Sequence, residues 1–370
     1  MDLKYILEVL FPYIVILYLF DCITYIKSHH LLFVSDLGKG FRLKEAGLHL
    51  VGLLPVSQSV ASHNLPLCFT NNGVHTVADG HQYKSGLYEA KDFHFIPYQD
   101  LITVETDGKA VKINGKVSIK TPSGVIARHI IGLIQDLKGL QPSKRRKKIQ
   151  SFLAKATDLQ EIKTLRTAYS NPILYLKILS SILFTYTFIV LPLALYSELY
   201  LYINFFGLLV CMALNYLLII IMTYFAHQKI YREKCRHRVY SLISMILSPF
   251  TAVHVLNNLT RDIYARFDYL AVAAELLPSS AFQDLMRKEL YRINYTKAQN
   301  ENSPLVEFWN LRENSLHALL AELGIARQSL FIAPKKQDES ATSYCPLCGT
   351  EYMTELDRCS DCGAKLKEFE

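Results

Sequence analysis

The sequence lacks the motifs that identify the common classes of enzyme. It has no nucleophile elbow, no phosphate-binding loop, no HExxH zinc-protease motif and no glycine-rich dinucleotide fingerprint. Charge is also limited, because Asp, Glu, Lys and Arg make up 20% of the 370 residues and the formal net charge is +7. The distribution of charge is therefore more informative than its sum, and no motif favours catalysis.

A disulfide framework is also absent. Eight cysteines are present, but four of them are scattered: Cys22 and Cys211 lie in apolar segments, Cys68 precedes a strand-like run, and Cys235 lies in a basic loop. The other four are regularly spaced at the C-terminal end. In a reducing compartment, such spacing indicates metal binding rather than disulfides.

Apolar residues, by contrast, are abundant, at 51% of the chain. Three apolar segments, 5–26, 173–196 and 201–225, are each long enough to span a bilayer, which takes about 20 residues. A cleaved signal peptide is the alternative for 5–26. The weakly basic start and the lack of a small-x-small cleavage site favour an uncleaved anchor instead.

The charges that flank these segments predict their orientation. The short loop between the second and third segments has no Lys or Arg, whereas both outer flanks are basic. The positive-inside rule then places that loop outside and both flanks in the cytoplasm.

A fourth apolar stretch, 239–258, leaves the number of spans open. It has no charged residue, but it carries several Ser and Asn side chains and one His, which are more typical of an interfacial or re-entrant helix. Three spans leave the C-terminus in the reducing cytoplasm, whereas four place it outside. We expect three, because thiolate metal sites belong to reducing compartments.

Residues 27–140 have the pattern of a cytoplasmic β-rich α+β domain. Turn dipeptides such as Asp107-Gly108 and Asn114-Gly115 separate short alternating runs, which predicts a β-meander. The spacing then becomes helical after Ser123, a suitable N-cap, and Gly139 is a suitable stop.

The runs "LCFTNNGVHTV", "IPYQDLITVE" and "VKINGKVSIKT" with the helix after Ser123 resemble a bacterial pleckstrin-homology-like domain. That resemblance implies a membrane-proximal interaction platform. An unrelated small α+β domain is the alternative. Histidines are frequent here, but without metal-ligand spacing, so we expect surface or satisfied side chains. These histidines are His29, His30, His49, His75, His81, His94 and His129.

Residues 144–170 begin with a basic run and continue with apolar residues at helical spacing. This predicts a basic amphipathic helix along the membrane surface. The run could bind anionic lipid headgroups. Nucleic acid is the alternative partner, which we do not favour because no nucleic-acid-binding fold accompanies the charge. The basic residues are Lys144, Arg145, Arg146, Lys147 and Lys148.

Residues 259–333 predict a helical cytoplasmic region, with a first helix capped by Thr260 and a last one between Pro304 and Gly324. Trp309 lies within that last helix, and we expect its side chain in the protein core. The acidic residues of this region predict solvated helix faces with basic partners rather than a catalytic group. They are Asp262, Asp268, Glu275, Asp284 and Glu289.

After a polar linker, 334–342, residues 343–370 contain two identical CxxC pairs, Cys345/Cys348 and Cys359/Cys362, each followed by Gly. This pattern resembles the zinc-ribbon family, which implies a structural Zn(II) held by four thiolates, with no open position for a substrate. So small a segment needs the metal to fold. Iron–sulfur or redox use of the pairs is the alternative.

The sequence thus predicts an integral membrane α-helical protein with three spans, a cytoplasmic β-rich domain, a helical C-terminal region and a small zinc ribbon. We expect it in a bacterial inner membrane, as a scaffold whose ribbon docks a cytoplasmic protein. A transport or channel component assembled by oligomerisation is one alternative, and a membrane-interface enzyme with a lipid-like substrate is another.

Overall fold

The computed structural model describes residues 3–26, 31–34, 42–43, 48–49, 58–61, 67–77, 87, 92–121, 123–196, 205–230, 262–277, 279–299, 303–333, 335–354, 356–361 and 363–369. Several predictions lie outside these residues, namely the apolar stretch 239–258, the helix cap Thr260, the ligand Cys362 and the histidines His29, His30 and His81. The chain divides into two compact units. One comprises residues 1–62 and 160–265, and the other residues 63–159 and 266–370.

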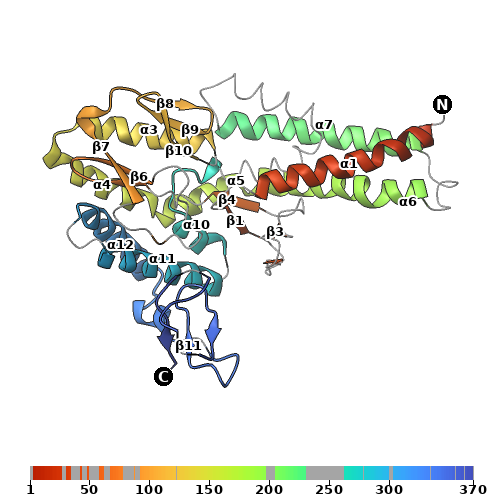
Figure 1. Ribbon diagram of the computed structural model, residues 1–370. Helices are drawn as coiled ribbons and strands as arrows, with labels where there is room; N and C mark the ends of the chain where they lie inside the picture. The colour runs from red at the N-terminus through yellow and green to blue at the C-terminus, as the bar shows by residue number, and fades with distance from the viewer. Residues whose placement is uncertain are drawn as a thin grey trace. The chain divides into compact units, whose positions relative to one another are not determined.

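The first unit is mainly helical among its described residues, and its long helices run side by side (Figure 1). Its small sheets are two antiparallel pairs, β1 with β4 and β2 with β3. Its described elements are α1 (Leu3–Ile26), β1 (Leu31–Val34), β2 (Arg42–Leu43), β3 (Leu48–His49), β4 (Gln58–Ala61), α5 (Leu159–Thr185), the short π-helix η3 (Tyr186–Val190), α6 (Leu191–Tyr196) and α7 (Phe205–Ile230).

By length and composition, two helical segments of this unit can cross a membrane. They are Leu174–Tyr196, which runs through α5, η3 and α6, and Phe206–Phe225 in α7. The apolar stretch described in α1, Tyr5–Ile16, is shorter than a span. The structure therefore shows two of the three expected candidates at full length.

Much of the apolar surface of these two segments is exposed in the structure. Only 22% of the most apolar stretch of the α7 segment is buried. Phe206 is 72% exposed, and Leu214, Leu217 and Leu218 are half exposed. Exposed apolar side chains in such number are typical of a surface that contacts a membrane or another protein.

Polar contacts link the helices of the first unit. The Asn215 amide of α7 donates a hydrogen bond of 3.2 Å to the Leu179 carbonyl of α5. The Tyr196 hydroxyl donates to the Glu8 carbonyl of α1 at 3.3 Å, and the Tyr196 ring lies 6.2 Å from that of Phe11. Polar side chains that bond between helices are typical of helix packing in membranes.

The second unit contains the predicted β-meander. Strands β8 (Val104–Asp107), β9 (Ala110–Ile113) and β10 (Lys116–Lys120) pair antiparallel in the order β10-β9-β8. Both turns contain left-handed residues, with φ of 60° at Gly108, 52° at Asn114 and 77° at Gly115. The Asn114 side chain also accepts from the Ile102 N–H at 2.8 Å. The turn residues thus fix the register, as the sequence predicts.

The helix predicted after Ser123 is confirmed as α3 (Gly124–Gly139). The Ser123 hydroxyl caps it, accepting from the Ile126 N–H at 3.2 Å. Apolar residues at helical spacing form its buried face, and α3 packs against β8 and β9. The residues of this face include Ile126, Ile130, Leu133, Ile134 and Leu137.

A second small sheet, β5-β6-β7, comprises Leu67–Phe69, Gly73–Val77 and Phe93–Pro97. Gly73 begins β6 where the neighbouring strand passes very close. A Cβ atom at Gly73 would lie 2.3 Å from the Ile96 carbonyl oxygen and 2.9 Å from the Pro97 Cα. Backbone atoms cannot move aside cheaply, so this position requires glycine.

We expect Gly73→Ala to lower the free energy of unfolding by about 1–3 kcal/mol, because it over-packs this site. The matched control is Gly132→Ala on α3, where an added Cβ meets nothing within 4 Å. That change is expected to raise stability by about 0.5–1 kcal/mol through helix propensity. Thermal unfolding of the detergent-solubilised protein measures the stability change of each variant. Equal changes in the two variants would refute the packing argument.

The helices that follow differ from the prediction in two places. The basic helix expected over 144–170 is interrupted at Thr157–Asp158, so that α4 (Pro142–Ala156) is separate from α5. The first C-terminal helix, predicted from Thr260, is interrupted by a turn at residues 264–268 before α10 (Tyr269–Leu276) begins, and Thr260 itself lies outside the described residues. Asp268 is the N-cap of α10, since its carboxylate accepts from the Leu270 N–H at 2.9 Å. An Asp cap therefore ends the preceding turn and starts the helix.

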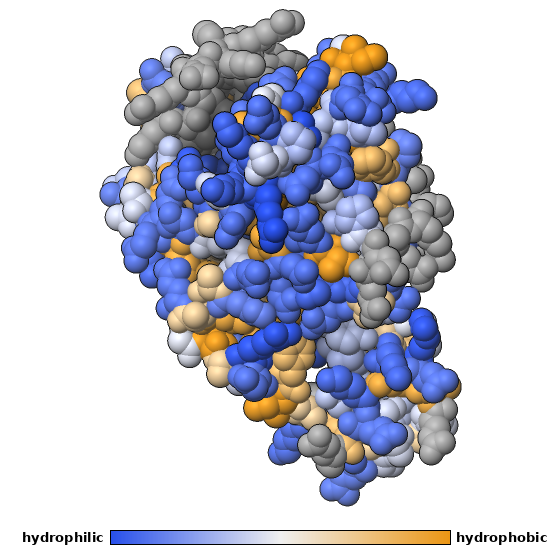
Figure 2. Space-filling view, turned by 90° about the vertical axis from the view of Figure 1, so that its left-hand side faces the viewer, coloured by the Kyte–Doolittle hydropathy of each residue, from blue (hydrophilic) through white to orange (hydrophobic). Residues whose placement is uncertain are grey.

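The remaining helices agree with the sequence. α11 spans Ser279–Gln299 and α12 spans Leu305–Glu322, with Pro304 as N-cap and Gly324 in the left-handed conformation (φ 68°) after its end. α12 packs against α4, α11 and β5. The face of the molecule in Figure 2 is mainly hydrophilic, with small separate hydrophobic areas, in contrast to the exposed apolar helices of the first unit.

Candidate metal centre

The C-terminal residues 343–369, which we call the cysteine module, hold two similar tight turns. In each turn the glycine N–H donates to the carbonyl of the first cysteine, Gly349 to Cys345 and Gly363 to Cys359, both at 2.9 Å. The glycines have φ of 78° and 71°, which residues with a Cβ adopt only with strain. The glycine after each CxxC pair therefore has the expected conformational role.

The two turns bring three thiols together. The sulfur atoms of Cys345, Cys348 and Cys359 all lie within 4.8 Å of one another, with 3.5 Å between those of Cys348 and Cys359. Cys345 and Cys359 are buried, Cys348 is exposed, and all three are free thiols. The fourth predicted ligand, Cys362, lies outside the described residues.

This spacing fits a tetrahedral thiolate site. Zn–S bonds of about 2.3 Å put the sulfur atoms about 3.8 Å apart, which is close to the separation found here. Three soft sulfur ligands select Zn(II) or iron–sulfur chemistry over hard cations. The three cysteines can thus bind a metal ion, and the ligand type restricts which metals are suitable.

Hydrogen-bond donors surround the sulfur atoms. The Leu347 and Cys348 N–H groups both donate to the Cys345 sulfur at 3.4 Å. The Tyr352 hydroxyl donates to the Cys359 sulfur at 3.2 Å, and this bond raises the pKa of Tyr352. Donors of this kind stabilise thiolates around a metal. Sequence reasoning did not find the role of Tyr352, because spacing alone does not show that the spacer folds back.

A small sheet holds the turns in place. Strands β11 (Ser343–Tyr344), β12 (Glu351–Tyr352) and β13 (Lys367–Glu368) form an antiparallel sheet in the order β12-β11-β13. The predicted linker residues are bonded to this module: the Gln337 and Asp338 N–H groups donate to the Glu351 carboxylate at 2.8 and 3.0 Å. The segment before the module is therefore part of its structure.

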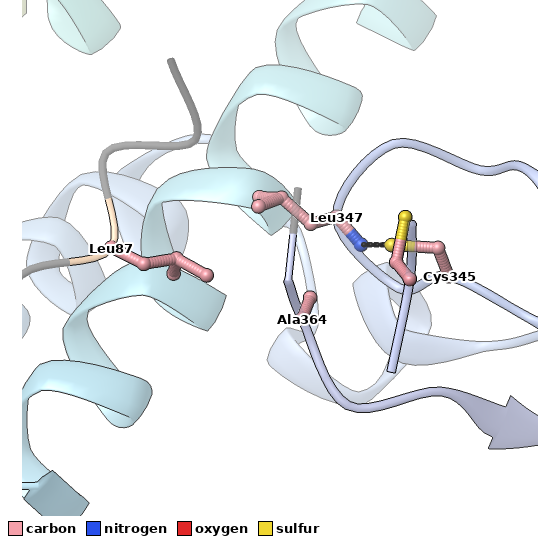
Figure 3. Packing of buried hydrophobic residues seen from close by; sticks show 5 residues of the cluster. Leu87, Cys345, Leu347 and Ala364 are labelled. Atoms are coloured by element: carbon pink, nitrogen blue, oxygen red, sulfur yellow. Dashed lines mark hydrogen bonds between the residues drawn. The ribbon is translucent and has the colours of Figure 1, made fainter. Parts of the chain in front are cut away.

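The module also packs on the helical region through an apolar cluster (Figure 3). Leu347 points away from the Cys345 sulfur, and the partly buried rings of Tyr291 and Tyr295, both on α11, pack against this cluster. Arg287 of α11 donates to the Pro346 carbonyl. The first cysteine turn is thus a packing element as well as a candidate ligand set.

Several side chains of the basic run in α4 form contacts within the protein. Arg145 donates to the carbonyls of Leu137 and Asn71 at 2.9 and 2.7 Å and lies over the Tyr98 ring. Two ion pairs use the same run, Arg146 with Glu307 at 3.2 Å and Lys148 with Asp136 at 2.6 Å. Lys144 and Lys147 are exposed.

The histidines of the β-rich domain are separate from one another where they are described. His75 is buried against Phe95, with ring centroids 4.6 Å apart, and burial lowers the pKa of His75 to about 4. His94 is exposed. His129 lies beside the Phe152 ring at 5.4 Å, and burial lowers its pKa. Among the described residues, histidines form no metal-ligand group.

The prediction that the acidic residues lie on solvated faces is wrong for Asp268 and Glu289. Both are buried, and Arg312 joins them, at 2.6 Å to Asp268 and 3.0 Å to Glu289. The Tyr269 hydroxyl donates to the second Glu289 oxygen at 3.0 Å. These residues come from α10, α11 and α12, and the group is a buried ion-pair network that joins three helices.

Comparison with known proteins adds no assignment. No protein-family model matches the chain, and no curated protein or solved structure matches it either.

Proposed function

We propose that this chain is a membrane-anchored interaction protein whose C-terminal zinc ribbon docks a cytoplasmic protein. One observation carries the proposal. The same chain contains exposed apolar helices long enough to cross a membrane and three cysteines whose sulfur atoms lie close together. In this proposal α1 is the third span, and the positive-inside rule puts the β-rich domain and the C-terminal helical region on the cytoplasmic side.

The zinc is structural in this proposal. Cys345, Cys348 and Cys359 supply three thiolates, Cys362 supplies the fourth, and a site closed by four protein ligands has no position for a substrate. Holding the metal folds the module, because the module is too small to fold on its apolar core.

The surface of the module suits protein contact. Leu347 and Ala364 are buried in the cluster with α11, whereas Met353 is 62% exposed and Leu356 is 47% exposed. Both exposed residues lie in the segment between the two cysteine turns, whose position depends on the metal. A folded ribbon therefore presents an apolar surface that an unfolded one would lose.

Site-specific photo-crosslinking in cells tests this function. A photoreactive residue at Leu356 is expected to give one discrete protein crosslink, which disappears when Cys345→Ser is introduced. The matched position is Thr106, exposed on β8 and distant in sequence from the module. The absence of a discrete crosslink at Leu356, or the same crosslink from Thr106, would contradict docking through the ribbon.

A further inference from the structure

A cavity in the second unit lies apart in sequence from the cysteine module. Its volume is about 80 Å³, and it is lined by residues of β5, α3, α4, α12 and the turn at residues 266–268. Aromatic and aliphatic side chains form most of the wall, including Phe69, Phe152, Leu153, Phe267 and Phe308. A site for one water needs about 10–15 Å³ by this measure, so the cavity accommodates a larger molecule.

Two ring nitrogens at the cavity lining are buried and have no hydrogen-bond partner among the described residues. They are Nε2 of His129 and Nε1 of Trp309. A buried polar group left unpaired destabilises the fold, so such groups commonly indicate a bound partner. The indole N–H only donates, and a neutral imidazole nitrogen either donates or accepts. The partner that suits both nitrogens is a hydrogen-bond acceptor.

The charges around the cavity favour an anion. Arg312 and Asp268 line the cavity but are paired with each other, and Arg312 also binds Glu289. Glu289 in turn lies 3.5 Å from Arg292. The acidic groups are thus balanced by these two arginines, and Arg266 adds a further guanidinium to the wall. Burial lowers the pKa of His129, and the nearby Arg266 charge lowers it further.

We propose that this cavity is a binding site for a small amphipathic carboxylate. The carboxylate accepts from Trp309 and His129 beside the Arg266 guanidinium, and the aliphatic body contacts the aromatic wall. A bare inorganic anion would leave the apolar wall in contact with water, and a hydrocarbon would leave both nitrogens unpaired. An aliphatic acid of about six carbons meets both requirements at this volume.

Trp309 is the single tryptophan of the chain, so its fluorescence reports on the cavity directly. Hexanoate is titrated into the full-length, detergent-solubilised protein, with tryptophan emission as the readout. We expect a saturable change with a Kd on the order of 0.1–1 mM, within the limit for a ligand of this size. Hexanol and hexylammonium, of the same length, are expected to bind at least about tenfold more weakly, a difference of 1.4 kcal/mol.

Two variants locate the signal. Arg266→Gln removes the cation and is expected to weaken hexanoate binding about tenfold, the effect of losing 1.4 kcal/mol. Ala156→Phe fills the cavity and is expected to abolish saturation. The matched control, Lys155→Gln, removes a charge from an exposed position on α4 and leaves the affinity unchanged. Thermal unfolding confirms that each variant is folded before it is titrated.

Three outcomes would overturn the proposal. They are no saturable change with hexanoate in the folded wild type, equal affinity for hexanol, and a hexanoate signal that survives in folded Ala156→Phe. None of these results depends on the zinc ribbon or on membrane topology, so failure here is distinguishable from failure of the proposed function.

Discussion

Replacement of Arg312 by methionine is expected to lower the free energy of unfolding by about 3–5 kcal/mol, because it leaves two buried carboxylates without their cation. Arg312 is paired with Asp268 at 2.6 Å and with Glu289 at 3.0 Å, and all three side chains are buried. In thermal unfolding of the detergent-solubilised protein, this corresponds to a fall in Tm on the order of 10 °C.

Two further variants separate the lost ion pairs from lost packing. In Arg312→Met/Asp268→Asn/Glu289→Gln, the charges are removed together, the helix cap is kept by Asn and the Tyr269 hydroxyl keeps an acceptor. We expect this triple variant to recover most of the lost stability, because a buried ion pair replaced as a whole costs little. Equal destabilisation of the single and triple variants would show that packing, not charge, explains the effect.

A more exposed ion pair provides the matched control for Arg312. Lys112 of β9 bonds to Asp107 of β8 at 2.6 Å, and the Asp107 side chain is 66% exposed. Exposed pairs contribute little to stability, so Lys112→Met is expected to leave the stability almost unchanged. A loss comparable to that of Arg312→Met would contradict the assignment of the buried network as the larger stabilising contact.

The second large effect concerns the metal. Cys359→Ser is expected to abolish stoichiometric zinc binding and to unfold the cysteine module, because a structural zinc site contributes roughly 10–16 kcal/mol of apparent binding energy to a fold of this size. The wild type is expected to retain about one zinc per chain. The measurement is zinc content after gel filtration, with limited proteolysis of residues 343–369 as the test for unfolding.

The control for this loss is another cysteine. Cys211 is a free, exposed thiol on α7. Cys211→Ser is therefore expected to keep both the zinc and the protease resistance of the module. If the wild type contains iron instead of zinc, or if Cys359→Ser keeps its metal, the structural zinc assignment is refuted.

Local signals explain which parts of the fold can be predicted from the sequence. The turns at Gly108 and Gly115, the cap at Ser123 and the glycine after the first cysteine pair each depend on a few neighbouring residues. Each requires either a left-handed backbone or a hydroxyl group at a helix start, and the residue type at that position shows which. These features are therefore found where the sequence places them.

The contacts that sequence reasoning missed are long-range. Arg312 lies 44 residues from Asp268 and 23 from Glu289, so no spacing rule connects them. The cavity likewise depends on how separate helices meet. The break between α4 and α5 is different, because Asp158 followed by Glu161 is a capping-box pattern and could have predicted the start of α5. The start of α10 at Asp268 had only the N-cap residue type as a signal, without the Glu or Gln of a capping box.

Membrane topology is the most direct test of the account. Single cysteines are placed at Ser197, Asn72 and Ser340 in a background without Cys235, and labelled with a membrane-impermeant thiol reagent in intact and permeabilised cells. We predict that Ser197→Cys is labelled in intact cells, and that Asn72→Cys and Ser340→Cys are labelled only after permeabilisation. Labelling of Ser340→Cys from outside would contradict it, because the cysteine module would then lie in an oxidising space, where a thiolate metal site is not expected.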